Sequence, residues 1–278
     1  MHIELGKFNQ LEIVKEVDFG LYLDGGEDGE ILLPSRYVPE EYQLGDLLNV
    51  FIYLDNEERL VATTLTPYVQ VGEFACLKVS WVNQYGAFLD WGLMKDLFVP
   101  FREQKSKMEE GRNYVIHAHI DEESYRIVAS AKVERYLSKE HPSFQPGEEV
   151  NAMVWQKTDL GFKVIVNNEF SGLLYENELF RPLQTGIKLK AFVKQVREDG
   201  KIDLSLQKAG MANIHDFATV LLDYIKAHNG FTPLNDKSSS DEIYETFEVS
   251  KKTFKKAVGD LYKKRLIILK NDGIYLAK

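Results

Sequence analysis

Residues 147–155 have the sequence GEEVNAMVW, residues 160–162 are LGF, and Gly186 follows 25 residues after Gly161. Two earlier sets of three glycines have the same spacing, 14 residues and then 25: Gly6, Gly20 and Gly45, and Gly72, Gly86 and Gly111. A fixed spacing that recurs along a chain is the signature of a repeated structural unit. The chain is therefore predicted to hold three copies of one small domain.

Each repeat has the pattern of β-strands. In the third repeat, Val150, Ala152 and Val154 alternate with their neighbours, which indicates a half-buried strand. The middle glycine lies inside the next apolar run, where glycine usually marks a bulge, a bend or a close backbone approach. Three more short apolar runs follow in each repeat, with turns rich in Asp, Glu, Asn and Gly between the last two. Five short strands in roughly 65 residues are typical of a small OB-type barrel.

In this pattern the repeats resemble the S1 RNA-binding domain. The third repeat is the clearest copy, with GEEV at 147–150, LGF at 160–162, SGLL at 171–174 and KIDLSL at 201–206. The second repeat keeps YGAF at 85–88, and the first is the most diverged. The resemblance implies three tandem five-stranded OB barrels that bind nucleic acid, mostly single-stranded RNA.

The repeats also depart from the S1 family, which has aromatic residues on both sides of the middle glycine and a histidine in the third strand. Two repeats keep the aromatic pair, as Phe19 with Tyr22 and as Tyr85 with Phe88. The third has Leu160 and Lys163 instead. The histidine position holds other residues throughout: Pro34, Pro100 and Tyr175. RNA contacts are therefore expected to be degenerate or divided among the repeats.

The C-terminal segment has a helical period instead of a strand period. Helices are predicted at 215–228, 240–247 and 251–265, followed by strands at 266–269 and 274–276. Residues 231–237 are predicted to form a turn, and Asn-Asp-Gly at 271–273 is a hairpin signal. Three helices and a terminal hairpin resemble a winged helix-turn-helix domain, whose third helix enters the DNA major groove in DNA-binding versions.

The third of these helices is strongly basic, with a local net charge of +6. Its basic residues are Lys251, Lys252, Lys255, Lys256, Lys263, Lys264 and Arg265. Their helical spacing places most of the charge on one side. The charge favours a surface for nucleic acid or an acidic partner, and a merely solvated face is the alternative.

Together the domains resemble the conserved virulence factor B family of bacterial S1-domain proteins over essentially the whole chain. The predicted fold class is therefore mostly β and multidomain: three OB barrels at 1–66, 67–143 and 144–210, and an α+β winged helix at 211–278. The resemblance implies an RNA-binding regulator that acts after transcription, without catalysis.

Charge is distributed unevenly along the chain. The net charge is −9, which argues against phosphate binding by the molecule as a whole. Residues 1–66 contain 4 basic and 14 acidic residues, a net charge of −10, so the rest of the chain is close to neutral. The first repeat is therefore predicted to bind RNA weakly or not at all, despite Phe19 and Tyr22, and to serve as a packing platform or acidic decoy.

In the second repeat, Tyr85 and Phe88 are the predicted stacking residues, because aromatic rings stack on bases of any sequence. The pleat alone would put them on opposite faces unless the Gly86 bend brings them together, and either ring could instead fill the barrel. Arg102 is predicted to meet phosphate. Trp81, Trp91 and Phe98 are further stacking candidates, but each is expected rather to lie in the core or to pack between domains.

The third repeat supplies the other predicted RNA contacts. Its rings are Phe162 and Tyr175, and its basic residues are Lys163, Lys188, Lys190, Lys194 and Arg197. A basic strip on one strand face beside a ring suits a single strand better than a duplex. Ordinary surface lysines are the alternative.

No enzyme signature is present. The sequence has no Walker loop, nucleophile elbow or His-Glu-x-x-His motif. His117 and His119 would suit a metal pair, but no Cys or carboxylate follows at ligand spacing within that strand. Neither a metal nor a cofactor is predicted. One cysteine, no apolar stretch of about 18 residues and no signal-peptide pattern favour a cytoplasmic protein without a membrane partner.

The predicted function is binding of single-stranded RNA by repeats two and three, with the basic winged helix assisting and avidity joining weak modules. Two alternatives stay open. One is a transcription regulator that binds duplex DNA through the winged helix. The other is a scaffold in which the OB grooves and the basic helix hold protein partners.

Overall fold

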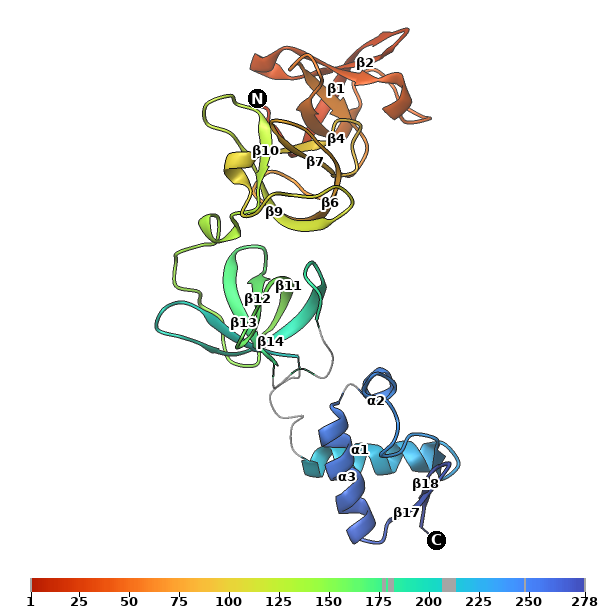
Figure 1. The fold of residues 1–278 in the computed structure, drawn as a ribbon. Coiled ribbons are helices and arrows are strands. Elements are labelled where there is room, and N and C mark those ends of the chain that lie inside the picture. The colour runs from red at the N-terminus through yellow and green to blue at the C-terminus, as the bar shows by residue number, and fades with distance from the viewer. Residues whose placement is uncertain (1, 177–178, 180–182, 207–213, 248, 278) are drawn as a thin grey trace. The chain divides into compact units, whose positions relative to one another are not determined.

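The computed structural model describes residues 2–176, 179, 183–206, 214–247 and 249–277. It contains three closed five-stranded barrels and a C-terminal winged helix, the predicted fold class (Figure 1). The chain forms two compact units, Met1–Tyr136 and Leu137–Lys278. The first unit holds two barrels, and the second holds the third barrel and the winged helix.

The three barrels repeat one topology. The first consists of β1 (Phe8–Val17), β2 (Gly20–Asp24), β3 (Glu30–Pro34), β4 (Leu47–Leu54) and β5 (Leu60–Thr63). The second consists of β6 (Phe74–Val82), β7 (Gly86–Asp90), β8 (Leu97–Pro100), β9 (Asn113–Ile120) and β10 (Ile127–Ser130). The third consists of β11 (Glu149–Thr158), β12 (Gly161–Val166), β13 (Phe170–Tyr175), β14 (Lys188–Val196) and β15 (Ile202–Ser205). In each, the third and fifth strands pair in parallel and close the barrel.

The middle glycine of each repeat opens the second strand, where the third strand passes very close. A Cβ on Gly161 would lie 2.1 Å from the carbonyl oxygen of Leu174, and Gly20 and Gly86 meet the same obstacle at 2.1 and 2.3 Å. The bend is located elsewhere. The first strand of each barrel carries a bulge, where the pairing register shifts at Val14, Ser80 and Trp155. Close backbone approach therefore explains the glycine, and the bulge supplies the curvature.

The two barrels of the first unit share apolar packing. Trp91 is 3% exposed, and its ring meets that of Phe51 from the first barrel edge to face, with centroids 5.7 Å apart. The backbone N–H of Val71 donates to the carbonyl of Gly6 at 2.9 Å. Lys95 Nζ donates to the carbonyl of Asp55 at 2.7 Å. Trp91 therefore packs between domains, as predicted.

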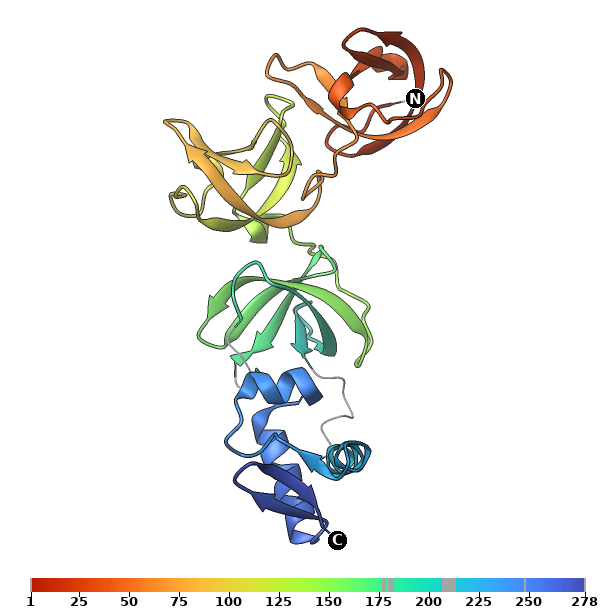
Figure 2. The same ribbon diagram turned by 90° about the vertical axis from the view of Figure 1, so that its right-hand side faces the viewer.

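The winged helix is built from α1 (Ile214–Ala227), α2 (Ser240–Phe247) and α3 (Lys251–Lys263), followed by a hairpin of β17 (Ile267–Lys270) and β18 (Gly273–Leu276) (Figure 2). Ser250 caps α3, because its side chain accepts from the backbone N–H of Thr253. The prediction of a plain turn after α1 was wrong. Phe231–Thr232 form β16, which pairs with β18 and makes a three-stranded sheet.

The predicted domain limits at 66/67 and 143/144 stay predictions, and the limit at 210/211 lies outside the described residues. Among the helices in the described part of the chain, none is both long and apolar enough to cross a membrane.

Candidate nucleic-acid interface

The shared register of the barrels allows their outward positions to be compared. In the second barrel, Trp81 on β6 faces Phe88 on β7, which faces Phe98 on β8. The equivalent positions are Lys15, Tyr22 and Leu32 in the first barrel, and Gln156, Lys163 and Leu173 in the third. Only the second barrel therefore carries three aromatic rings across these three strands.

These rings form a stack on the barrel surface. The Trp81 and Phe88 rings are parallel within 1°, with centroids 3.8 Å apart, and Phe98 follows at 4.9 Å. Trp81 is 43% exposed, and its Nε1 donates to Asp96 Oδ2 at 2.9 Å. Because this hydrogen bond fixes the indole beside Phe88, its outer face is held open to solvent. Trp81 is thus an exposed residue of the stack, so the expectation that it lies in the core was wrong, whereas Phe98 is half-buried beside Phe88.

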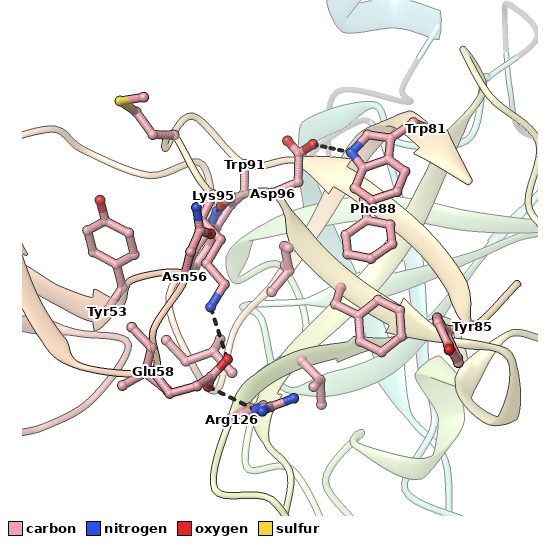
Figure 3. Close-up of a pocket in the computed structure, with 16 residues that line it drawn as sticks. Tyr53, Asn56, Glu58, Trp81, Tyr85, Phe88, Trp91, Lys95, Asp96 and Arg126 are labelled. Atoms are coloured by element: carbon pink, nitrogen blue, oxygen red, sulfur yellow. Dashed lines mark hydrogen bonds and ion pairs between the residues drawn. The ribbon is translucent and has the colours of Figure 1, made fainter. Parts of the chain in front are cut away.

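Tyr85 and Phe88 line the same groove, although they lie three residues apart (Figure 3). Tyr85 stands in the turn before β7 and is 65% exposed. Its backbone N–H and that of Gly86 are held by Asn83 Oδ1 at 2.8 and 3.2 Å. The tight turn around Gly86 therefore brings the two rings to one groove.

The groove has a volume of about 620 Å³, and both barrels of the first unit line it. Tyr53, Asn56 and Glu58 come from the first barrel. The second barrel contributes the ring stack with Tyr85 and two cations, Lys95 and Arg126. Glu58 lies between these cations, 3.5 Å from Lys95 Nζ and 2.9 Å from Arg126 Nε (Figure 3). The site thus combines exposed rings with a charged rim.

Arg102 lies outside the residues that line this groove. It pairs with Asp121 at 2.6 Å and with Glu123 at 3.2 Å, and these two acids raise the pKa of its guanidinium. Arg102 is exposed but already paired with two carboxylates, which a phosphate would have to replace, so its contact with phosphate stays a prediction.

Phe162 of the third barrel is corrected as well. It is 4% exposed and belongs to the apolar core of that barrel, so it offers no ring face for stacking. Lys163, its neighbour, lies with its Nζ 5.2 Å from the ring centre of Trp155. Lys188 and Lys190 are exposed on one strand face as predicted, and Lys190 is paired with Glu149 at 2.6 Å.

Tyr175, Lys194 and Arg197 form a structural cluster at the edge of the third barrel. Arg197 pairs with Asp203 at 2.5 Å and donates to the hydroxyl of Tyr175 at 2.6 Å, while Lys194 Nζ lies 5.8 Å from the Tyr175 ring centre. Asp203 is 3% exposed. Burial alone would raise the pKa of Asp203, but hydrogen bonds from Arg197 and Gln195 outweigh it and hold the pKa below its usual value. Arg197 is thus committed to a buried carboxylate, which corrects its predicted role as a phosphate contact.

The basic face of α3 contrasts with the paired cations of the barrels. Lys251 donates to the carbonyl of Ser238, and Lys264 pairs with Asp260. Four lysines form no ion pair within the described ranges: Lys252, Lys255, Lys256 and Lys263. With Gly259 they form one stripe opposite the buried side of the helix, and Arg265 is exposed just beyond it. This stripe therefore presents four exposed positive charges on one face of α3.

His117 and His119 are held by aromatic packing. His117 stacks on Tyr136 at 4.1 Å, and the Tyr136 hydroxyl lies 3.1 Å from His119 Nε2. Burial lowers the pKa of both imidazoles, to about 4 for His117, where the nearby His119 adds to the effect. Within the described residues, no three His, Cys, Asp or Glu side chains are grouped to hold a metal ion.

Sequence reasoning missed Lys95, Arg126 and Glu58. Nothing in their local sequence distinguishes them from other surface charges, because the groove arises where two barrels meet. The signal that could have found them is the alignment of the repeats. It places Arg126 directly before the fifth strand of its barrel, the position of Arg59 in the first.

Comparisons with known proteins agree with this architecture. A family model described as the S1 domain matches residues 5–65, which form the first repeat, although that repeat was expected to be the most diverged copy. A model described as the CvfB-like winged helix domain matches residues 219–276. "Uncharacterized protein YitL" of Bacillus subtilis is 29% identical, over 96% of this chain and 92% of its own length. "Conserved virulence factor B" is 27% identical in Staphylococcus epidermidis, over 99% and 95%, and 25% in Staphylococcus aureus, over 99% and 94%.

A crystal structure of a multidomain protein with nucleic acid binding domains from Streptococcus pneumoniae is 27% identical and covers 98% of both chains, with a TM-score of 0.43. The S1 and winged-helix domains are of the nucleic-acid-binding type. The comparisons thus show an S1 domain and a CvfB-like winged helix domain at the two ends of the chain, and similarity along 99% of its length to homologues named conserved virulence factor B.

Proposed function

We propose that the protein binds single-stranded RNA and acts after transcription, without catalysis, and that the groove of the second barrel is its principal base-binding site. The observation that carries the proposal is the stack of Trp81, Phe88 and Phe98 on an open face. The outer face of Trp81 and the ring of Tyr85 are free to receive bases. Stacking of this kind requires unpaired bases, which a duplex does not offer.

The third barrel has a smaller part in this proposal. Its ring at the same register is replaced by Lys163, and Phe162 is buried. Lys188 and Lys190 remain on an exposed strand face and contribute electrostatic attraction to the backbone of a bound strand. The α3 stripe contributes in the same way. The first barrel, with its net charge of −10, is proposed to bind no backbone of its own.

The test is fluorescence anisotropy of the full chain with labelled oligouridylate, comparing the wild type with Trp81→Ala and Phe88→Ala. Each loss of a stacking ring is expected to weaken binding about 10-fold, since a base stack contributes about 1–3 kcal/mol. Tyr22→Ala, at the same register in the first barrel, is the matched control and should change affinity less than about twofold. Equal binding by all four proteins would reject the groove as the site.

Duplex binding by α3 is a second candidate, favoured by the unpaired lysine stripe. A protein that uses it should bind duplex DNA tightly at low salt, and the substitution of Lys252, Lys256 and Lys263 by Ala should abolish that binding. If naked nucleic acid of any kind fails to bind, the scaffold alternative gains support.

A further inference from the structure

We propose that Glu58 of the first barrel controls the selectivity of the second barrel's groove by occupying its two cations in place of a phosphate. This inference rests on the proposed function, because it concerns the same groove. Lys95 and Arg126 are the only Lys or Arg side chains that line the groove in the described residues. Glu58 holds both of them, with one carboxylate oxygen on each.

Glu58 lies in a turn position with a left-handed backbone. Its φ is +65°, the left-handed region that costs a side chain about 1 kcal/mol or more and favours glycine. The third barrel has Gly200 at the equivalent turn position, with φ +77°. The second barrel has Tyr125 at this position, with φ +56°, so the backbone conformation belongs to the turn in all three barrels. What distinguishes Glu58 is the contact of its carboxylate with two cations of the next barrel.

The turn aims this carboxylate at the groove. Asp55 organises the loop by accepting from the backbone N–H groups of Glu57 and Arg59, and its own carbonyl accepts from Lys95 Nζ at 2.7 Å. Glu57 points elsewhere and pairs with Arg59 at 3.0 Å within the turn. The side chain of Glu58 therefore contacts the second barrel, whereas that of Glu57 pairs within its own turn.

Selectivity follows from competition. An uncharged base can stack beside Trp81 without disturbing Glu58, whereas a phosphate near the groove must displace the carboxylate from Arg126 or Lys95. The groove as built therefore favours ligands whose bases enter the stack over ligands that present backbone alone. Removing the carboxylate releases two cations, so affinity for phosphate should rise and selectivity should fall.

The experiment compares full-length wild type with Glu58→Gln, Glu58→Gly and Glu57→Gln by anisotropy with labelled oligouridylate of about 12 nucleotides. Inorganic tripolyphosphate serves as a backbone-only competitor. Glu58→Gln should bind the RNA about fivefold tighter at low salt. Its salt slope should be steeper by about 0.7 for each phosphate gained. Tripolyphosphate should compete with it more strongly than with the wild type. Glu58→Gly relieves the backbone strain while removing the same charge, so it should reproduce the result if the glutamine variant folds poorly.

Glu57→Gln removes the same charge one residue away and should match the wild type within about twofold. If Glu58→Gln and Glu58→Gly behave like Glu57→Gln, or bind less tightly than the wild type, the competition is disproved. The variant Trp81→Ala distinguishes a wrong role for Glu58 from a wrong binding site. If Trp81→Ala binds RNA more weakly than the wild type, the groove is supported as the binding site even if Glu58 has no effect. When it leaves binding unchanged, the proposed function fails, and this inference fails with it.

Discussion

Single side chains determine which barrel presents a stack of aromatic rings on its surface. Trp81, Phe88 and Phe98 occupy positions that Lys15, Tyr22 and Leu32 occupy in the first barrel. The backbone register is the same in both, so the difference in predicted binding depends on side-chain chemistry alone. Charge acts in the same direction, because the first barrel also carries most of the acidic excess.

His117 makes the first unit sensitive to acid. Its pKa is about 4 in the folded protein, lowered by burial and by His119, against about 6.5 in the unfolded chain. Between these values the unfolded chain binds a proton that the folded chain does not, so stability falls as the pH drops from about 6.5 to 4, by up to about 3 kcal/mol. Urea unfolding at a series of pH values should show this loss.

The substitution His117→Phe removes the titrating group and keeps a ring between Phe74 and Tyr136. The variant should lose the part of the pH dependence that His117 contributes, while His119, whose pKa burial also lowers, retains its own part. The exposed His2 offers the control, and His2→Ala should keep the wild-type slope. An unchanged slope in His117→Phe would assign the acid sensitivity to other groups.

Replacement of glycine by alanine is expected to have opposite effects on stability at Gly161 and at Gly259. Gly161 has φ +147° and no room for a Cβ beside the Leu174 carbonyl, so Gly161→Ala should destabilise the third barrel by about 3 kcal/mol. Gly259 lies in α3, and a Cβ added there would meet nothing within 4 Å, so Gly259→Ala should stabilise the winged helix by about 0.5–1 kcal/mol. Thermal unfolding would measure both, and opposite signs are the expected result.

The elements themselves could largely be predicted from the sequence. Glycine spacing and period-2 alternation located the barrel strands, because both depend on local chain geometry that every repeat shares. The short β16 was missed, since two residues such as Phe231–Thr232 are too few to show a period. The groove could not be predicted in full. Lys95, Arg126 and Glu58 come from separate elements, and the packing of two barrels brings them together.

Two predictions of RNA-contacting residues were wrong for a similar reason. Phe162 and Arg197 have the right chemistry for RNA, but the chain uses one as core and the other to neutralise the buried Asp203. A sequence shows that a ring or a cation exists and does not show what already contacts it. Exposure and partners separated the Trp81 stack and the α3 lysines from the rest.

The whole chain is expected to bind long strands more tightly than any one of its sites does, because linked modules raise the effective concentration at each other. Substitution of Lys252, Lys256 and Lys263 by Ala should therefore weaken binding of an RNA of about 30 nucleotides, and leave binding of about 6 nucleotides nearly unchanged. Trp81→Ala should weaken both. Titrations with the two lengths check this, and equal losses for both lengths in the lysine variant would count against joint engagement.

The common register of the three barrels has a consequence for protein engineering. The positions of Trp81, Phe88 and Phe98 correspond to Gln156, Lys163 and Leu173 in the third barrel. The three side chains of the stack can therefore be transferred to another barrel with the same backbone register. Substituting Trp, Phe and Phe at these positions of the third barrel should create a second aromatic stack without changing the strand pairing. The number of nucleotides that the protein contacts could then be set by design.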